Sequence, residues 1–341
     1  MNKIIEQDCR EILSRVDFTK IKGKKILVTG ATGFLGQYVV AALSLANNEL
    51  KLNALIYAVG FSSPKRSFSS ILEGDPMVKF KKVDLSGEFN LKGFDYIFHA
   101  AGYGQPAKFI DDPLSLVKIN VNATSELLKW SPKSTFIYFS SAEIYGEVLS
   151  EFIPTKEDYN GNHPLHKPRS VYGESKRLGE ALCSAYKMKN GTNVKIVRIS
   201  HVYGPGLPIS DTRVMSDFIR KALVEKNIIL LDEGRAVKTY GYITDVISMI
   251  FFTAFKGKDM VYNVGGQDSI SIYELAKKIS KYTKASCKIP KTRSTISHIG
   301  KDPVVVRLDL SKIIKEMKRF NFTTFDKGLE RTIEWAREQI K

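Results

Sequence analysis

The sequence has few cysteines, no long apolar run and no signal-peptide core. Its three cysteines, Cys9, Cys183 and Cys287, lie far apart and form no C-x-x-C pair, so neither a disulfide framework nor a zinc site is expected. No apolar stretch reaches the roughly 20 residues that a membrane-spanning helix needs. Residues 1–18 mix charged with apolar positions, unlike a signal peptide. These absences predict a cytoplasmic protein that has no membrane partner.

Basic residues exceed acidic ones, but they form no dense tract. The chain contains 52 lysines and arginines against 36 aspartates and glutamates, a formal net charge of +16, and it has no run of five basic residues. A solvated basic surface accounts for this pattern, and a cleft for a phosphorylated small molecule is the alternative. Nucleic acid is not expected as a partner. With 341 residues, 43% of them hydrophobic, the chain is long enough for two unequal lobes.

Short apolar runs alternate with helical stretches between residues 24 and 199. Such alternation indicates βαβ units and a parallel sheet. The predicted fold class is therefore α/β: a Rossmann doubly wound parallel sheet with a smaller C-terminal substrate-binding lobe. Residues 4–16 predict one additional helix at the N-terminus. The expected strands are 24–29, 52–59, 78–83, 96–101, 135–140 and 194–199, and the expected helices are 36–46, 114–130 and 171–189.

A glycine-rich loop follows the first predicted strand and opens a helix. The sequence GATGFLG, from Gly30 to Gly36, has the spacing of a dinucleotide-binding turn. Gly30 permits the tight turn, Gly33 lets the backbone approach a pyrophosphate, and Gly36 lets the helix pack on the strand. The helix N-terminus then stabilises the phosphates. This loop predicts a bound NAD or NADP.

The second predicted strand does not end in the acidic residue that would bind the ribose 2′-hydroxyl of NAD. The stretch from Tyr57 to Arg66 reads YAVGFSSPKR and contains no aspartate or glutamate. Asp84, after the third predicted strand, is placed to meet the adenine. Four residues after the second strand are candidates for holding the 2′-phosphate of NADP: Ser62, Ser63, Lys65 and Arg66.

Tyr172 and Lys176 are four residues apart on a predicted helix and therefore share one face. A nearby ammonium lowers the pKa of a phenol, and such a tyrosine can take a proton from a sugar hydroxyl while hydride leaves the same carbon. Ser141 is placed to hydrogen-bond the oxygen that Tyr172 deprotonates. Glu143 is a candidate second acid/base or substrate anchor. These four residues form the predicted catalytic group.

Six motifs, in order along the chain, resemble those of the extended short-chain dehydrogenase/reductase family, the nucleotide-sugar epimerases and dehydratases. The resemblance implies oxidation of a sugar at C4 by a retained NAD that is later reused, with Ser141, Tyr172 and Lys176 as the triad. This reuse favours NAD over NADP. It also implies a nucleotide-diphosphate sugar as ligand, and a homodimer formed through helices 114–130 and 171–189. The motifs, within about residues 24–270, are GATGFLG, FHAAG (98–102), INVNAT (119–124), SSAEIYG (140–146), YGESK (172–176) and VYGPG (202–206).

The motifs and the resemblance together assign the remaining contacts. His163 and His166 form H-x-x-H in a loop without a third ligand at suitable spacing, so no metal is expected. The residues expected to contact the cofactor are Gly30, Thr32, Gly33, Phe34, Leu35, Gly36, Ser62, Arg66, Asp84, Leu85, Ala100, Ala101, Gly102, Asn120, Tyr172, Lys176, Ile199 and His201. Those expected to contact the substrate are Tyr103, Gln105, His201, Arg213, Val214 and Lys238. The expected parts are an N-terminal helical extension (1–22), an NAD(P)-binding Rossmann domain (23–200 and 236–262) and a nucleotide-sugar-binding lobe (201–235 and 263–341).

Within the family, the chain looks most similar to the UDP-glucuronate decarboxylases. The likeness is concentrated in residues 159–177 and 211–223, where Arg213 matches an arginine of their pattern, and Glu143 matches their active-site glutamate. In such enzymes C4 oxidation creates a β-keto acid, from which CO₂ leaves readily because the C4 carbonyl accepts the electrons.

Three positions depart from the decarboxylase pattern: Ala142 replaces Ser or Thr, His201 replaces Asn, and Lys238 replaces Arg. A 4-epimerase typically has S-A-T here, which matches Ala142 but not Glu143. A 4,6-dehydratase needs an acid at the position of Ala142, so dehydration ranks lower. An NADPH-dependent 4-keto-sugar reductase needs only the triad and ranks second. A non-catalytic NAD(P)-binding sensor is the rival class, but it has no need of the triad.

Overall fold

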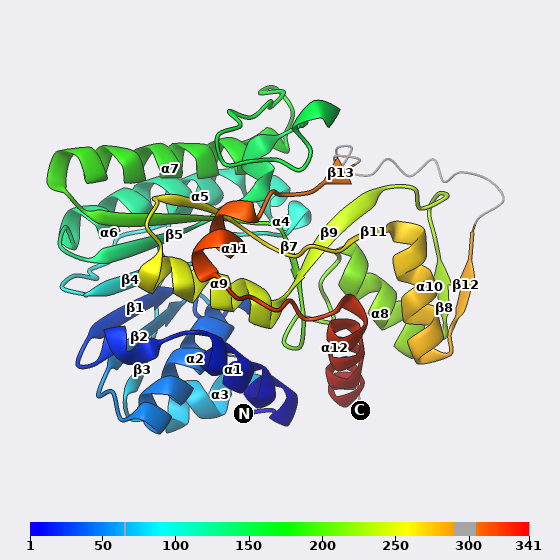
Figure 1. Cartoon of the computed structure of the whole chain (residues 1–341), viewed down its shortest axis with the longest axis horizontal. Helices are drawn as coiled ribbons and strands as arrows, with labels where there is room; N and C mark the ends of the chain where they lie inside the picture. Colours follow the sequence, from blue (N-terminus) through cyan, green and yellow to red (C-terminus); the bar gives the residue numbers. More distant parts are fainter. Residues whose placement is uncertain (65, 290–304, 341) are drawn as a thin grey trace.

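A seven-stranded parallel sheet forms the largest element of the chain (Figure 1). The computed structural model describes residues 1–64, 66–289 and 305–340. The strands run in the order β10-β6-β5-β4-β1-β2-β3, which is the order of a doubly wound Rossmann sheet. Their bounds are β1 (Lys25–Thr29), β2 (Leu55–Gly60), β3 (Val78–Lys82), β4 (Tyr96–His99), β5 (Thr135–Ser141), β6 (Asn193–Ile199) and β10 (Val261–Val264).

Helices cover both faces of this sheet (Figure 1). Because helices shield both faces, the central strands are apolar along their length, and β5 is buried from Phe136 to Ser140. One face carries α1 (Lys3–Arg15), α2 (Phe34–Leu50), α3 (Arg66–Gly74) and α9 (Ile243–Lys256). The other carries α5 (Pro113–Val117), α6 (Thr124–Trp130) and α7 (Ser170–Asn190), and the short α4 (Pro106–Asp111) leads into α5.

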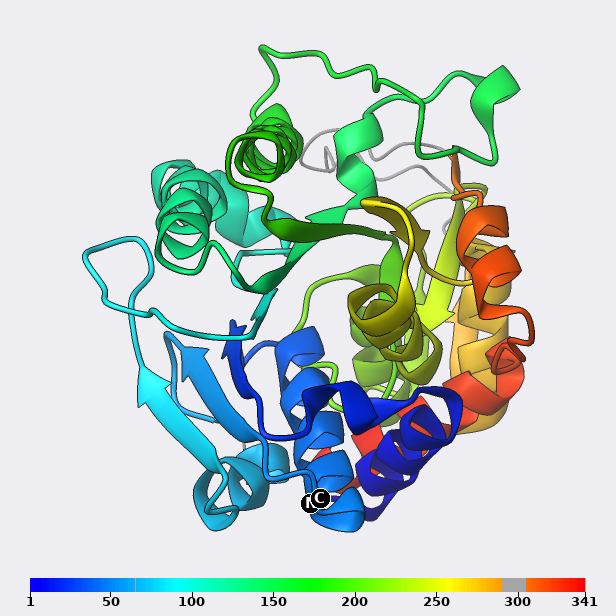
Figure 2. The same cartoon turned by 60° about the vertical axis from the view of Figure 1, so that its left-hand side comes forward.

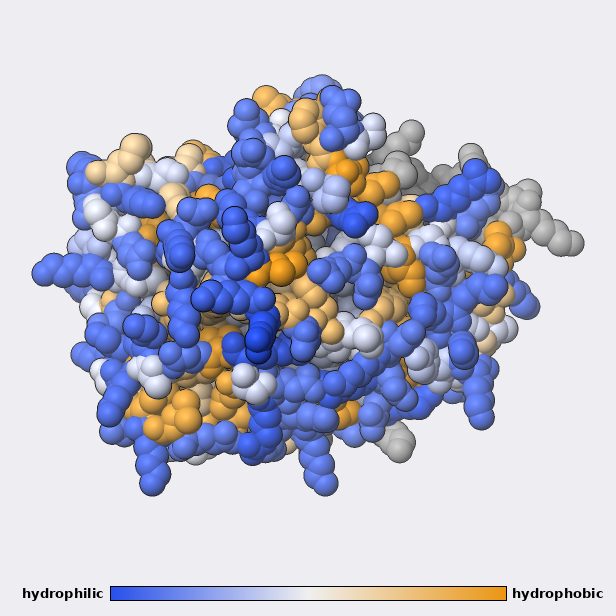
Figure 3. Space-filling model, viewed as in Figure 1, coloured by the Kyte–Doolittle hydropathy of each residue, from blue (hydrophilic) through white to orange (hydrophobic). Residues whose placement is uncertain are grey.

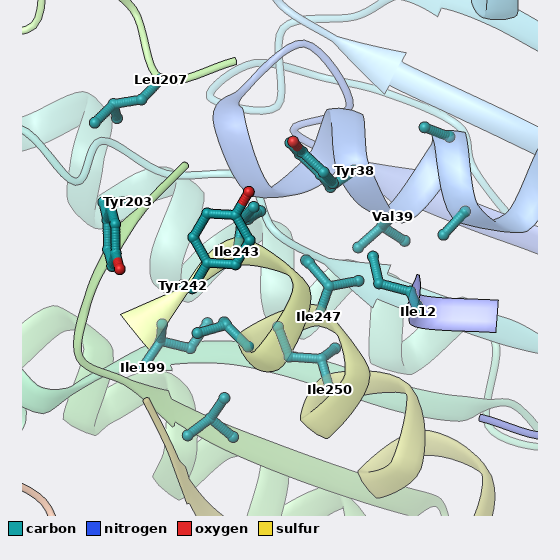
Figure 4. Close-up of a cluster of buried hydrophobic side chains, with 14 of the residues drawn as sticks. Ile12, Tyr38, Val39, Ile199, Tyr203, Leu207, Tyr242, Ile243, Ile247 and Ile250 are labelled. Atoms are coloured by element: carbon teal, nitrogen blue, oxygen red, sulfur yellow. The ribbon is translucent and has the colours of Figure 1, made fainter. Parts of the chain in front are cut away.

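The larger part of the core lies between the sheet and the helices α1, α2 and α9. Figure 4 shows Ile12 of α1 and Val39 of α2 packed toward Ile243, Ile247 and Ile250 of α9, all buried. The predicted N-terminal helix is therefore part of the core of the Rossmann half. A second cluster, which includes Leu27, Ile97, Leu127, Phe136 and Cys183, lies on the opposite face of the sheet under α6 and α7.

The helix predicted at residues 114–130 is broken into three parts. Between α5 and α6 the residues Lys118–Ala123 form one π-helical turn, η2, in which Ile119 and Asn120 are buried. A π-turn inserts one extra residue into a helix and is frequent at functional sites. The insertion changes the direction of the following side chains. The carboxamide of Asn120 reaches α7, the helix that carries Tyr172 and Lys176, in this arrangement.

A smaller lobe follows β6. Its four-stranded sheet has β9 at the centre, paired with β7, β11 and β13, and β8 pairs with β12. The prediction placed 236–262 in the Rossmann domain, but β9 belongs to this second sheet, whereas α9 and β10 belong to the first. The bounds are β7 (His201–Tyr203), α8 (Val214–Val224), β8 (Asn227–Ile229), β9 (Val237–Tyr242), β11 (Ser269–Ser271), α10 (Ile272–Thr283), β12 (Ser286–Lys288), β13 (Val305–Val306), α11 (Ser311–Met317) and α12 (Phe325–Ile340).

Asp8 of α1 ties the N-terminal helix to both halves of the molecule. Its buried carboxylate accepts hydrogen bonds from the hydroxyls of Tyr38 on α2 (2.9 Å) and Tyr242 on β9 (2.9 Å). Arg331 of α12 donates a third hydrogen bond at 3.0 Å. Burial raises the pKa of Asp8 to about 7, against the opposing effect of its partners. Figure 2 shows α1 beside the C-terminal helix.

The surface is mostly hydrophilic on the face shown in Figure 3, where apolar side chains gather only in small patches. Across the described ranges, none of the helices combines the length and apolar character needed to traverse a membrane. The described residues also form the short 3₁₀ turns η1 (Phe18–Ile21), η3 (Ala142–Tyr145) and η4 (Ser150–Phe152). Of these, η3 carries Glu143 and directly follows β5, so it lies at the edge of the sheet where the candidate site forms.

Candidate active site

The glycine loop has the geometry that its sequence predicted. Gly30 has a φ of +66°, and a Cβ there would lie 2.6 Å from the carbonyl oxygen of Ala100. A Cβ at Gly36 would overlap the carbonyl oxygen of Gly30, so only glycine permits this approach of α2 to the loop. Gly33 is the N-cap of α2 and has no side chain to accept the first N–H groups of the helix. These groups can bind a phosphate.

Residues after β4 complete this edge of the cleft. β4 lies beside β1, at the point where the order of the strands reverses. Sheets of this kind bind ligands at this point. The backbone N–H of Ala101 points to Thr29 Oγ1 at 3.4 Å. Gly102 has a φ of +143°, and a Cβ there would lie 3.1 Å from Asn120 Oδ1 and 3.5 Å from Lys176 Nζ. The loop after β4 thus meets the π-turn and α7.

Ser175 decides which way the Asn120 carboxamide faces. The Ser175 hydroxyl donates its single proton to the carbonyl oxygen of Tyr172 at 3.0 Å. It must therefore accept at Asn120, and Nδ2 donates to it at 2.9 Å. Asn120 Oδ1 then faces Gly102 and, although buried, accepts no hydrogen bond from the described residues. A buried acceptor with this aim suits a hydroxyl of a bound cofactor.

Tyr172 is held in a defined position. The residue is 9% exposed, and its ring stacks on Phe109 with centroids 4.9 Å apart and an interplanar angle of 8°. Burial raises the pKa of the phenol, a hydrogen bond with Ser141 lowers it, and the charge of Glu143 raises it. The charges of Arg213 and Arg169 act in the lowering direction.

Lys176 is buried on the next turn of α7. Its Nζ donates to the carbonyl oxygen of Phe139 at 2.8 Å and lies 5.0 Å from the centroid of the Tyr138 ring. Burial lowers the pKa of Lys176 to about 7, while the charge of Glu180 opposes the shift. The expected lowering of the Tyr172 pKa is not found, because burial of the phenol outweighs the cationic groups around it.

Glu143 has a partner that sequence reasoning did not single out. The guanidinium of Arg169 binds its carboxylate through two hydrogen bonds, Nε to Oε2 at 3.1 Å and Nη2 to Oε1 at 2.8 Å. The side chains are 17% and 22% exposed, so the pair is largely shielded. Arg169 is also the N-cap of α7, three residues before Tyr172. An arginine so close in the sequence to Tyr172, the predicted catalytic tyrosine, was the available signal.

The predicted substrate residues fall into two groups. Gln105 and Arg213 both bind Asp211, at 2.7 Å from Gln105 Nε2 and 2.7 Å from Arg213 Nη2. Val214 begins α8 directly after Arg213. His201 on β7 and Lys238 on β9 belong to the second sheet, where the His201 ring lies 5.7 Å from that of Tyr240. Tyr103 is half-buried on the loop before Gln105, and burial raises its pKa.

Other predicted cofactor residues line the same edge of the sheet. Thr32 lies 3.2 Å from Ser62, hydroxyl to hydroxyl, at the end of β2. Asp84 follows β3, and its carboxylate accepts hydrogen bonds from the backbone N–H and the hydroxyl of Ser86 at 2.8 and 2.7 Å. Lys65 and the side chain of Arg66 lie outside the described part of the structure. The remaining ones are Phe34 and Leu35 at the start of α2, Leu85 after β3, Ala100 after β4 and Ile199 at the end of β6.

Two histidines near the site have structural roles. His99 Nδ1 lies 2.7 Å from Thr29 Oγ1 and its Nε2 lies 3.1 Å from Thr124 Oγ1. Burial lowers the pKa of His99 to about 3, so the ring is neutral. His163 contacts the carbonyl oxygen of Glu143 through Nε2. Both ring nitrogens of His99 are thus occupied by threonine hydroxyls.

The strand order, the glycine loop at the start of α2 and the group of Ser141, Tyr172 and Lys176 define an enzyme of the Rossmann type that uses a dinucleotide. The chain belongs to the NAD dependent epimerase/dehydratase family, whose model matches residues 26–265. This membership confirms the predicted family, the α/β fold and the class of NAD-dependent enzyme.

Curated relatives and solved structures agree with this placement. UDP-glucuronic acid decarboxylase 1 of Xenopus tropicalis is 25% identical over 320 residues, covering 93% of this chain and 73% of the relative. UDP-glucuronic acid decarboxylase 6 of Arabidopsis thaliana is 28% identical over 290 residues, covering 84% and 81%. A dTDP-glucose 4,6-dehydratase from Streptomyces venezuelae, solved with NAD, superposes with a TM-score of 0.77 at 23% identity, covering 92% and 97%. A UDP-glucuronic acid 4-epimerase from Bacillus cereus gives 0.74 at 24%, covering 93% and 100%.

Proposed function

We propose that the chain uses bound NAD to oxidise C4 of a nucleotide-diphosphate sugar, and that this sugar is a uronate which then loses CO₂. The observation that carries the proposal is the paired Glu143 and Arg169 beside Tyr172. An arginine with two parallel N–H groups matches a carboxylate in geometry as well as in charge. The carboxylate of a uronate can exchange with Glu143 on this guanidinium. The curated relatives at 25% and 28% identity act on the same class of substrate by name.

The residues have distinct roles in this proposal. Ser141 hydrogen-bonds the C4 oxygen, and Tyr172 takes the proton from it as a phenolate, after its own proton has left to solvent. Bound NAD supplies the acceptor for the C4 hydride, and the glycine loop and Asn120 hold it. Once C4 is a ketone, the C6 carboxylate is β to it and CO₂ can leave. The carbon that lost CO₂ takes up a proton from solvent, and Glu143, once displaced from the guanidinium, is placed to relay it. Return of the hydride to C4 and of the proton from Tyr172 to the C4 oxygen would then complete the pentose.

A 4-epimerase that acts on the same uronate is the second candidate. Ala142, which follows Ser141, matches the epimerase pattern, and the buried Lys238 stands where the decarboxylase pattern has arginine. Incubation with UDP-glucuronate and mass spectrometry of the product separates the two reactions. A UDP-pentose indicates decarboxylation, and a changed sugar of unchanged mass indicates epimerisation. Unchanged UDP-glucuronate, with turnover of a neutral sugar such as UDP-glucose instead, would overturn the assignment of a uronate.

The apolar side chains on α5 and α7 support a homodimer as part of the proposal. Leu114, Leu178 and Met188 are 74%, 49% and 82% exposed on the outer side of these helices. A two-fold axis beside α7 would pack these side chains against the same helices of a second subunit and remove them from water. Sedimentation should give a dimer at micromolar concentration and a monomer for Leu178→Glu. Leu50→Glu, at a site 51% exposed at the end of α2, is the matched control and should leave the dimer intact.

The cysteines support a reducing compartment. Cys9 and Cys183 are buried and free, and Cys287 is free and partly exposed. A chain with three unpaired thiols fits the cytoplasm, where thiols stay reduced. We therefore include a cytoplasmic location in the proposal. Fractionation of the source cells, followed by detection of the protein with an antibody, tests it.

A further inference from the structure

Asp211 lies where the two lobes meet beside the candidate site. Its side chain is buried, with the residue 3% exposed. From the Rossmann half, Gln105 Nε2 donates to Asp211 Oδ2 at 2.7 Å across a separation of 106 residues in sequence. Gln105 is the N-cap of α4, on the loop that follows β4, whereas Asp211 precedes α8 of the smaller lobe. This hydrogen bond therefore connects parts of the chain that no local turn would bring together.

The same carboxylate holds Arg213. Arg213 Nε donates to Oδ1 at 3.0 Å, Nη2 donates to Oδ2 at 2.7 Å, and the backbone N–H donates to Oδ1 at 2.9 Å. Burial alone would raise the pKa of Asp211, but the hydrogen bonds and charge of Arg213 hold it below its usual value. The carboxylate therefore stays ionised at neutral pH, and it fixes the guanidinium through two parallel contacts.

Arg213 is fixed close to the catalytic tyrosine. Its positive charge is among the effects that lower the pKa of Tyr172. Its side chain is 36% exposed, and its Nη1 forms no hydrogen bond within the described part of the chain. A guanidinium whose Nε edge is bound and whose Nη1 end is open can bind an anion without first losing the mobility of a free side chain.

We propose that Asp211 is a positioning residue that links closure of the two lobes to recognition of the anionic part of the substrate. Its hydrogen bond with Gln105 joins the smaller lobe to the loop after β4. Its two hydrogen bonds with the guanidinium hold Arg213 near Tyr172. The inference rests on the proposed function, because the anion is the diphosphate or carboxylate of a nucleotide sugar. Breaking either contact should weaken substrate binding and leave the proton transfer at Tyr172 nearly unchanged.

Kinetics of the holoenzyme with UDP-glucuronate provide the first test. Gln105→Leu removes the contact between the lobes and should raise KM about tenfold, with kcat within about twofold, because one hydrogen bond to a charged group is lost. Gln105→Glu should raise KM further, because two carboxylates would face each other. Asp211→Asn should also raise KM, and Asp211→Glu should recover part of the loss. NAD retention should match wild type in every variant.

Asp217→Asn is the matched control. Asp217 holds Arg220 at 2.9 Å on α8, and Arg220 has the same 36% side-chain exposure as Arg213, but this pair lies within the helix and does not bridge the lobes. KM should be unchanged in this variant. An equal rise in KM for Asp217→Asn and Gln105→Leu, or a fall in kcat with unchanged KM for Gln105→Leu, would overturn the positioning role.

Hydrogen–deuterium exchange of the holoenzyme without sugar tests the contact between Gln105 and Asp211 independently of the reaction. Gln105→Leu should accelerate exchange about tenfold in both 103–112 and 208–214, since the lost contact is shared. Acceleration in one segment alone, or in neither, would refute a link between the lobes. A wild type that binds neither UDP nor UDP-glucuronate in calorimetry would overturn the proposed function, and the exchange result would still decide whether Asp211 fastens the lobes.

Discussion

The guanidinium of Arg169 chelates the carboxylate of Glu143 one turn before Tyr172, with hydrogen bonds of 2.8 and 3.1 Å. Both groups act on the phenol: the charge of Glu143 raises its pKa and that of Arg169 lowers it. A cation and an anion thus lie beside the residue that we propose moves a proton. An incoming carboxylate would replace one anionic partner of Arg169 with another, so the guanidinium stays paired in both states.

Arg169→Ala should lower kcat/KM for UDP-glucuronate by about 10²-fold, because two hydrogen bonds between charged groups are lost. Arg169→Lys keeps the charge without the planar fork and should recover only part of this. Lys167 lies two residues before Arg169 and forms an exposed ion pair with Glu147. Lys167→Ala breaks this pair and should have no effect on kcat/KM. Steady-state kinetics of the three variants measure the difference. Equal losses for Arg169→Ala with UDP-glucuronate and with UDP-glucose would contradict recognition of a carboxylate.

Tyr172→Phe should remove turnover while cofactor binding stays close to that of wild type. The hydroxyl moves the proton, whereas the ring supplies the stack on Phe109, and phenylalanine keeps the ring. General acid–base help of this kind is worth roughly 10²–10⁴-fold in rate. Single-turnover absorbance of NADH reports the oxidation step directly. Unchanged turnover would defeat the catalytic assignment and leave only the dinucleotide-binding fold.

Ser175→Ala should weaken NAD binding about tenfold without unfolding the protein, because Asn120 loses the acceptor that orients its carboxamide. Ser175→Thr keeps the hydroxyl and should bind NAD close to wild type. The measurement is the dissociation constant of NAD for protein freed of nucleotide, alongside the melting temperature. Loss of binding in Ser175→Thr as well as Ser175→Ala would indicate that space beside α7, and not the hydroxyl, is what matters.

Much of the Rossmann half could be predicted from the sequence, because its signals are local. Buried parallel strands appear as short apolar runs, and Gly30 and Gly36 are required by a turn only seven residues long from end to end. The four predicted catalytic residues do lie at one edge of the sheet, since strand order and one helix face place them there.

What could not be predicted depends on pairing across the chain. The contact of Arg169 with Glu143 requires the loop after η3 to fold back over 26 residues, and that of Gln105 with Asp211 spans 106. The π-turn at Lys118–Ala123 adds one residue to a stretch whose apolar spacing predicts a continuous helix, and a single inserted residue changes that spacing too little to mark the turn. Likewise, the sequence of β9 does not show which of the two sheets it joins, because that depends on pairing with β7, β11 and β13.

Lys176 should make the stability of the nucleotide-free protein depend on pH. Burial lowers its pKa from 10.5 to about 7 in the folded chain. Between about pH 7 and pH 10.5 the unfolded lysine binds a proton that the folded one has released, so the free energy of unfolding should rise with pH across this window. The slope for one group approaches about 1.4 kcal/mol per pH unit. Chemical denaturation at pH 7, 8 and 9 measures it.

Lys176→Met should remove this contribution and be more stable than wild type near pH 7, because the cost of burying an ammonium disappears. Lys187→Met, on the exposed end of the same helix, is the control and should keep the wild-type slope. The comparison isolates one residue, since the other titrating groups are common to all three proteins. Should Lys176→Met show the same dependence on pH as Lys187→Met, the ammonium would not be shielded in the folded chain, and its place against Phe139 and Tyr138 would have to differ from the one described.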